Sequence, residues 1–193
     1  ELSKYFENFN NIEYNEILAD TYYFDNNKDF QYLHKYMKDF KNKNLEKLFK
    51  NKNHYKSYNK NDIMIIGSLI EKEGLDYYDK KKISSVIFNR LNKKMKLQID
   101  ATVLFALTKG DYTLDRNLYL SDLKIDDPYN TYKIQGLPPS PISYVGTKTI
   151  DLIFENYKSD YLFYFFNNSL NKHIFSKNYN EHKIKLNEYR KNQ

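Results

Sequence analysis

The segment Asp62–Gly74 constrains the fold most, because its apolar residues recur at helical spacing. At about 100° per residue, four of them share one helix face: Ile63, Ile66, Leu69 and Ile70. Asp62 is a candidate N-cap, and Gly74 stands where a residue just beyond the C-terminus of a helix is expected. The pattern predicts a helix packed against a hydrophobic core.

Glu73 is unusual in this segment, because it falls within about 20° of Ile66, inside the apolar face. Glu71 lies about 160° away from Glu73, outside that face. A carboxyl on a packed face loses hydration, so its pKa rises and it can hold a proton near neutral pH. Glu73 is therefore a candidate general acid. The alternative is a last-turn glutamate that reaches solvent past Gly74 or pairs with a lysine.

The rest of the chain reads as further helices and one hairpin. Helical patterns cover residues 28–50, 79–94, 147–157 and 178–191, with a short strand and then a helix over 98–107 and a short helix or turn over 121–125. A possible extended segment covers 18–24, and a hairpin is expected from 161–166 and 172–175. The fold class is therefore α+β, mainly helical with a small antiparallel sheet.

Several single residues carry structural expectations. Asp79 and Asp100 are candidate N-caps, and Gly110 would close the helix that starts near Asp100. Arg90 falls on the apolar face of the 79–94 helix, where a guanidinium needs a carboxylate or carbonyl partner. The alternative for Arg90 is a side chain that reaches past the core to solvent.

Two loops divide the chain. The polar residues 51–61 are the best candidate for a joint, so we divide the chain into an aromatic-rich, helical part (1–60) and a core (61–193). All four prolines lie between 128 and 141, which predicts a stiff, non-helical stretch over 127–142. Such a stretch is either a functional loop or a rigid crossover.

Composition narrows the chemistry by exclusion. The chain has no cysteine, and His34, His54, His173 and His182 are scattered without ligand spacing, so we expect no metal. Gly-rich phosphate loops, HExxH and GxSxG motifs are missing, and we expect no cofactor. Carboxyl acid–base chemistry on a polar substrate, as in glycoside cleavage, remains the most compatible class.

The net charge of +6 favours an anionic partner, such as an acidic cell-wall polymer, a membrane surface or nucleic acid. A lysine bias of the genome would give the same charge. Nucleic acid is the weakest of these partners, because the charge is spread along the chain and no binding motif is present. No apolar run is long enough to span a membrane.

Five motifs follow one another along the chain: Ser-Leu-Ile-Glu-Lys-Glu (68–73), Ser-Val-Ile-Phe-Asn-Arg-Leu (85–91), Met-Lys-Leu-Gln-Ile-Asp-Ala-Thr-Val (95–103), Tyr-Asn-Thr-Tyr (129–132) and Gly-Leu-Pro-Pro (136–139). In this order and spacing they resemble the YceG-like endolytic murein transglycosylase family. Asp20–Phe24, Phe175 and the pair Glu181 and His182 are similar to further family segments. The departures are small: Ala19, Gly67, Ile99, Ala101 and Ser140 replace the usual Pro, Ala, Ser, Pro and Gly.

The resemblance implies roles for particular residues. It places the catalytic acid on a lysozyme-like helix at Glu73, the residue that the helical face also selects. Candidates for holding the sugars are Gln98, Asp100, Thr102, Asn130 and Tyr132, and candidates for supporting the site are Ser68, Glu71, Asn89 and Arg90. The implied reaction cuts the β-1,4 bond between N-acetylmuramic acid and N-acetylglucosamine within nascent strands and leaves 1,6-anhydro ends.

The resemblance also implies a setting. Family members carry an N-terminal membrane helix and a LysM-like subdomain, and both are missing from this chain. Their absence and the first residue, Glu1, lead us to expect that the chain is a fragment. The expected location is then the periplasmic side of the inner membrane, with peptidoglycan strands as substrate and peptidoglycan synthases as partners. Two other functions stay open: a hydrolytic muramidase, which would need Asp79 or Asp100 as a second carboxylate, and a non-catalytic glycan-binding module.

Overall fold

The computed structural model describes residues 12–25, 29–51 and 57–192 of the chain. Within these ranges the helices are α1 (Phe30–Asn51), α2 (Lys60–Glu73), α3 (Tyr77–Asn92), α4 (Asp100–Thr108), the 3-10 helix η4 (Asp122–Lys124), α5 (Thr147–Phe154) and α6 (Tyr179–Lys191). The strands are β1 (Leu18–Ala19), β2 (Val145–Gly146), β3 (Phe163–Asn167) and β4 (Lys172–Ser176). The predicted α+β class is confirmed, with helices predominating.

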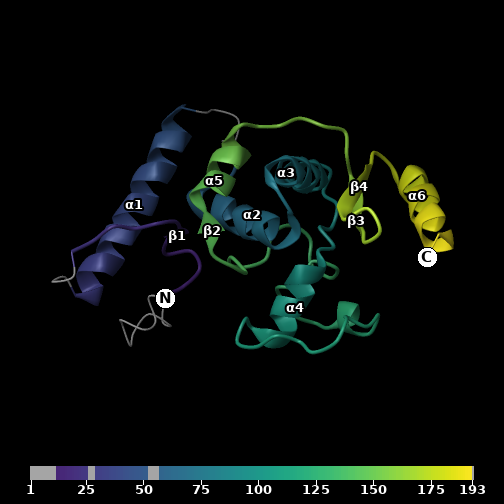
Figure 1. Ribbon diagram of the computed structural model, residues 1–193, viewed down its shortest axis with the longest axis horizontal. Coiled ribbons are helices and arrows are strands. Elements are labelled where there is room, and N and C mark those ends of the chain that lie inside the picture. Colours follow the sequence, from purple (N-terminus) through teal and green to yellow (C-terminus); the bar gives the residue numbers. More distant parts are fainter. Residues whose placement is uncertain (1–11, 26–28, 52–56, 193) are drawn as a thin grey trace.

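Helix α2 is the centre of the fold (Figure 1). It contacts α3, α4, α5 and β2, and every residue from Ile63 to Ile70 is buried. The predicted apolar face is therefore confirmed, but the helix is covered all round and not on that face alone. Gly67 permits the close approach of β2, because a Cβ at this position would lie 2.6 Å from Cγ1 of Val145.

The helix ends differ from several predicted caps. Asn59 caps α2, and Asp62 is its reciprocal partner three residues into the helix, so the predicted N-cap at Asp62 is wrong. Asp76 caps α3 by accepting from the backbone N–H of Asp79, so the predicted cap at Asp79 is also wrong. In both cases a second acidic or amide side chain three residues upstream forms the cap.

Helix α4 also departs from prediction at both ends. Asp100 is its first residue, and Ile99 occupies the cap position without a side-chain bond, so Asp100 is not an N-cap. Residues 98–99 form no strand; Gln98 instead has a left-handed backbone with φ of 52°. Lys109 ends the helix in a left-handed conformation, and Gly110 follows with φ of 84°.

Two small sheets complete the fold. β1 pairs with β2 in parallel, and this pair is much shorter than the extended segment predicted over 18–24. β3 and β4 form the predicted antiparallel hairpin, in which Tyr164 is paired with Phe175 and Phe166 with His173. Cross-strand partners share a face, so these four side chains point to the same side of the hairpin. Phe163 and Phe165 point to the other side, where they contact α6.

Helix α1 lies at the opposite side of the molecule from α6 (Figure 1). It packs in a small cluster with the segment before β1, made of Ile12, Ile17, Leu33 and Met37. Its Leu45 belongs to the main core together with Ile63 of α2. Part of the predicted joint, residues 52–56, lies outside the described residues, and the division of the chain at residue 60 stays a prediction.

Candidate active site

Glu73 is the last residue of α2, and its carboxyl group lies between that helix, the hairpin and the start of α4. Oε2 accepts a hydrogen bond of 2.9 Å from the hydroxyl of Tyr164 in β3. Burial raises the pKa of Glu73 above its ordinary value. The residue as a whole keeps some exposure to solvent. A carboxyl group of this kind can retain its proton and still be reached.

The surroundings of Glu73 pull its pKa in both directions. The negative charge of Asp100 raises the pKa further, since two nearby carboxylates disfavour a second charge. Three groups act against burial and lower the pKa of Glu73: the hydroxyl of Tyr164, the charge of His173 and the backbone amide of Ala101. These donors favour the ionised form, so the same site can accept a proton back after releasing it.

Glu71, two residues earlier, has the opposite electrostatics. Its carboxylate forms an ion pair with Lys80 and accepts a 2.9 Å hydrogen bond from the backbone N–H of Gly146. Burial raises the pKa of Glu71, but these bonds outweigh it and leave the pKa below its ordinary value. The two glutamates therefore differ as their helix faces indicated: the pKa of Glu71 is lowered in a structural cluster, and the pKa of Glu73 is raised by burial.

Tyr164 was not among the residues selected from the sequence. It is partly buried, and burial together with the charge of Glu73 raises its pKa well above the ordinary value, so it stays a hydrogen-bond donor. Its ring packs edge-on against His173, with centroids 5.3 Å apart. The alternation of the hairpin predicts which residues share its face, but nothing in the sequence indicates that this face meets Glu73.

His173 and Asp79 form a second pair behind Tyr164. Nδ1 of His173 lies 2.8 Å from Oδ2 of Asp79, and both side chains are almost fully buried. Burial raises the pKa of Asp79, but the bond to His173 and the backbone N–H of Leu75 lower it below the ordinary value. Asp79 is thus occupied as a structural acceptor.

The candidates for supporting the site lie where they can hold the backbone around it. Arg90 donates to the carbonyls of Leu162, Leu97 and Lys96 at 2.6, 2.7 and 3.2 Å. Burial lowers the pKa of Arg90, and its packed guanidinium has the carbonyl partners that the sequence called for. This arrangement fixes the start of the hairpin to the segment before α4.

Asn89 and Ser68 make similar connections. The amide of Asn89 donates to the carbonyls of Ser159 and Tyr161 at 2.8 and 2.9 Å, next to the hairpin. Oγ of Ser68 accepts from the backbone N–H of Ile142 at 3.0 Å, which ties the end of the proline-rich stretch to α2. These contacts position backbone segments.

The predicted sugar contacts separate into two groups. Gln98 and Asp100 are exposed, and Oδ1 of Asp100 accepts a 2.5 Å hydrogen bond from the hydroxyl of Tyr132. Burial and the charge of Asp100 raise the pKa of Tyr132. These three side chains lie at the surface next to the start of α4, where a ligand can reach them.

Thr102 and Asn130 form the second group, and the structure corrects their expected role. Both are fully buried. The amide of Asn130 donates to the carbonyls of Leu123 and Ile125, and its oxygen accepts from the backbone of Tyr132. The hydroxyl of Thr102 donates to the carbonyl of Ile99. With no accessible polar atom, they shape the loop that presents Tyr132 and cannot touch a sugar in this conformation.

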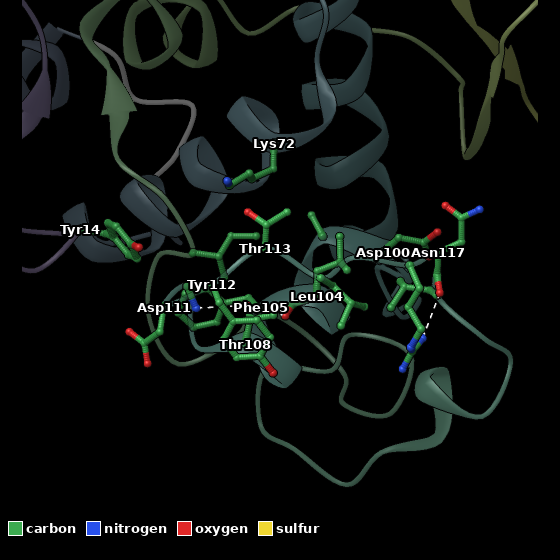
Figure 2. A pocket seen from close by; sticks show the side chains of 16 residues that line it. Tyr14, Lys72, Asp100, Leu104, Phe105, Thr108, Asp111, Tyr112, Thr113 and Asn117 are labelled. Atoms are coloured by element: carbon green, nitrogen blue, oxygen red, sulfur yellow. Dashed lines mark hydrogen bonds between the residues drawn. The ribbon is translucent and has the colours of Figure 1, made fainter.

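A groove of about 750 Å³ runs along α4 beside this cluster (Figure 2). Its walls are formed by α4, the segment from 110 to 118, Tyr14, Lys72 and Ile142. Glu73 does not line the groove itself, but it adjoins it through Ala101, which lines the groove and directs its amide at the Glu73 carboxyl. The groove and the acid are therefore neighbours on either side of Ala101.

Comparison with known proteins identifies the family. The model of the YceG-like family matches residues 7–188, almost the whole chain. The chain belongs to the YceG-like family. Its match to the endolytic murein transglycosylase of Bacillus subtilis (strain 168) is 46% identical over 120 residues, 62% of this chain and 32% of that protein. The enzyme of the same name from Streptococcus pneumoniae is 35% identical over 127 residues, 63% of this chain and 22% of that protein.

A solved structure gives the same result at the level of the fold. The crystal structure of a yceG-like protein from Listeria monocytogenes superposes with a TM-score of 0.74 at 34% sequence identity. The match covers 88% of this chain and 54% of that one. The chain thus spans only about half of this relative, and a third or less of the two curated relatives.

Two observations concern metals and membranes. Among the described residues, no cluster of three or more His, Cys, Asp or Glu side chains is arranged to hold a metal ion. In the same part of the chain, no helix combines the length and the apolar character needed to cross a bilayer.

Proposed function

We propose that this chain is the catalytic part of an endolytic lytic transglycosylase that cleaves peptidoglycan glycan strands. The observation that carries the proposal is Glu73, whose pKa is raised by burial and which adjoins an open groove. Membership in the YceG-like family and the names of the two curated relatives support the same reaction. The bond cleaved is the β-1,4 linkage between N-acetylmuramic acid and N-acetylglucosamine.

The first step is proton donation. Protonated Glu73 gives its proton to the glycosidic oxygen, and the bond breaks through an oxocarbenium-like state. The hydroxyl of Tyr164 and the amide of Ala101 stabilise the carboxylate that forms. These donors are fixed by the hairpin and by the first turn of α4, so they need no rearrangement during the reaction.

The second step returns the proton. The Glu73 carboxylate removes the proton from the C6 hydroxyl of the muramoyl sugar, and the oxygen attacks the anomeric carbon to close a 1,6-anhydro ring. Because the nucleophile belongs to the same sugar, little entropy is lost in bringing it to the reaction. No water is consumed, and no second carboxylate is required.

A hydrolytic muramidase is the second candidate, and Asp100 is the observation that favours it. Asp100 is exposed, lines the groove and lies close enough to raise the pKa of Glu73. It could activate a water or capture the sugar. Asp79, the other carboxylate considered, accepts at Oδ2 from His173 and from the backbone N–H of Leu75, and its side chain is almost fully buried, so it is held as a structural acceptor.

Mass spectrometry of glycan digests tests the proposal. The expected products carry anhydro ends, which are lighter by one water than hydrolytic ends, and the Glu73→Gln variant should yield none. Glu71→Gln is the matched control, since it removes a carboxylate from the same helix turn without removing the acid. Reducing ends alone would indicate a muramidase, and binding without any cleavage by the unaltered chain would indicate a glycan-binding module.

The setting of the whole protein is part of the proposal. A substrate that lies outside the cytoplasmic membrane favours a membrane-anchored protein with this region in the periplasm. Cleavage of nascent strands would place it beside peptidoglycan synthases, and terminating glycan elongation would be the outcome. Fractionation of cells and cross-linking of the full-length protein test the location and the partner. Loss of the protein to the cytoplasmic fraction would contradict both.

A further inference from the structure

We propose that the groove along α4 binds the peptide substituent of the muramoyl sugar, with Lys72 pairing with a carboxylate of that peptide. This inference rests on the proposed function and adds a recognition site to it. The groove would select strands that still carry peptides over strands from which they have been removed.

The position of the groove relative to the acid is the first argument. Lys72 precedes Glu73 on α2, and Ala101 both lines the groove and directs its amide at the Glu73 carboxyl. A muramoyl sugar that presents its anomeric carbon to Glu73 carries its peptide on the same ring. The peptide must therefore leave the ring close to the acid, and the groove is an open path of about 750 Å³ at that place.

The charge in the groove is the second argument. Lys72 is exposed, and among the described residues no acidic side chain forms an ion pair with it. The other cation in the lining, Arg116, is already neutralised by Asp122, with bonds of 2.6 and 3.2 Å to its carboxylate. Lys72 is thus the cation in the described lining that remains free for an anionic ligand, and a carboxylate suits it.

The acidic residues of the lining do not occupy Lys72. Asp100 accepts the hydrogen bond from Tyr132. Asp111 lies at the outer edge of the groove, with its carboxylate directed away from the other labelled side chains (Figure 2). Lys72 lies on the other side, at the α2 wall (Figure 2).

The walls of the groove suit a peptide better than they suit a glycan strand without peptides. Leu104 and Phe105 of α4 offer apolar surface, and Tyr112, 59% exposed, adds an aromatic ring with a hydroxyl. The volume lies within the range of roughly 300–1,000 Å³ that holds ligands of this class. A mixed apolar and polar lining, in which Lys72 is the free cation among the described residues, fits short side chains and a carboxylate.

Steady-state kinetics on paired substrates test the inference. We expect this chain to cleave peptide-bearing strands with a higher kcat/KM than the same strands stripped by an amidase. Lys72→Gln should reduce this preference about tenfold, or about 1.4 kcal/mol, chiefly through KM, and Lys72→Arg should restore much of it. Lys183→Gln, which removes the same charge from an exposed position on α6, is the matched control. An equal effect of Lys72→Gln on both substrates, or none, would overturn the inference.

Two further measurements keep this test separate from that of the proposed reaction. Leu104→Trp fills the groove from a partly exposed helix position, so it should reduce the peptide preference without altering Lys72. Titration of Glu73→Gln protein with a soluble muramoyl peptide reports binding without turnover, and Lys72→Gln in that background should weaken it. Binding that depends on Lys72, without anhydro products from the unaltered chain, would contradict only the proposed reaction. Anhydro products, with binding that does not depend on Lys72, would contradict only the proposal that the groove binds the peptide.

Discussion

Replacing Glu73 with Gln should remove activity and at the same time stabilise the fold at alkaline pH. Gln keeps the size of the side chain, and its oxygen can still accept from Tyr164, but it cannot release a proton. General acid catalysis contributes about 10²–10⁴-fold to a rate. The corresponding loss of transition-state stabilisation is about 3–5 kcal/mol.

The effect on stability follows from the direction of the pKa shift. Burial raises the pKa of Glu73 in the folded protein above its value in the unfolded chain. Its contribution to stability is therefore fully present below the unfolded pKa and is lost as the pH rises through the folded pKa. Over that window the unfolding free energy falls by at most about 1.4 kcal/mol per pH unit, and Glu73→Gln removes this loss.

Glu71→Gln gives the opposite pH dependence in the same helix turn. The pKa of Glu71 is lowered in the folded protein, so its contribution is present above the unfolded pKa and lost as the pH falls through the folded pKa. The substitution leaves Lys80 without its carboxylate and costs about 1–3 kcal/mol near neutral pH. At about 2–4 °C per kcal/mol, Tm should fall measurably while cleavage continues.

Thermal unfolding as a function of pH, combined with product analysis, checks both variants. The Tm difference between Glu73→Gln and the unaltered chain should grow in favour of the variant as the pH rises, and that for Glu71→Gln should shrink as the pH falls. A Glu73→Gln protein that is less stable than the unaltered chain at every pH would refute the burial argument. Retained cleavage by the same protein would remove Glu73 from the active site.

Three other substitutions separate the roles of the surrounding residues. Tyr164→Phe removes the donor to the Glu73 carboxylate, so the pKa of Glu73 should rise further and the alkaline limb of the kcat–pH profile should move to higher pH. The value of kcat should also fall, because about 1.5–3 kcal/mol of transition-state stabilisation from a charged hydrogen bond is lost. Asp100→Asn removes a charge that raises the pKa of Glu73, so the same limb should move to lower pH while anhydro products persist; complete loss of cleavage would favour the muramidase instead. Arg90→Lys breaks the hydrogen bonds to three carbonyls, because a lysine cannot reach them together. The free energy of unfolding, measured in urea, should fall by about 2–4 kcal/mol. An unchanged midpoint of urea unfolding would contradict this structural role.

Much of the fold could be predicted from the sequence, because its helices carry strong periodicity. The helix predicted over 28–50 is α1, and the hairpin predicted from two aromatic runs is β3 and β4. The caps were predicted less well. The sequence predicts caps at Asp62 and Asp79, but Asn59 and Asp76 hold those places, since several polar residues near a helix start can each form the bond.

The site was predicted unevenly for a related reason. Glu73 was identified because helical spacing alone places it beside Ile66 on a packed face. Thr102 and Asn130 belong to motifs of polar residues, and a motif does not reveal whether a hydroxyl or amide faces a ligand or the backbone. Their hydrogen bonds to nearby carbonyls became visible only when the loop around them was placed.

The groups that tune the acid are those that local sequence cannot supply. Tyr164 reaches Glu73 across 91 residues of chain, and His173 reaches Asp79 across 94. Helical spacing distinguishes Glu71 from Glu73, because the two residues lie on different faces of the helix. The direction of each pKa shift depends on residues outside the helix: Lys80 pairs with Glu71, and the hairpin covers Glu73. A hairpin docked differently would leave the same helix with a hydrated, ordinary carboxylate at its end. The acid is therefore a property of the α2–hairpin contact, and substitutions in β3 and β4 should change the pH dependence of cleavage as directly as substitutions in α2.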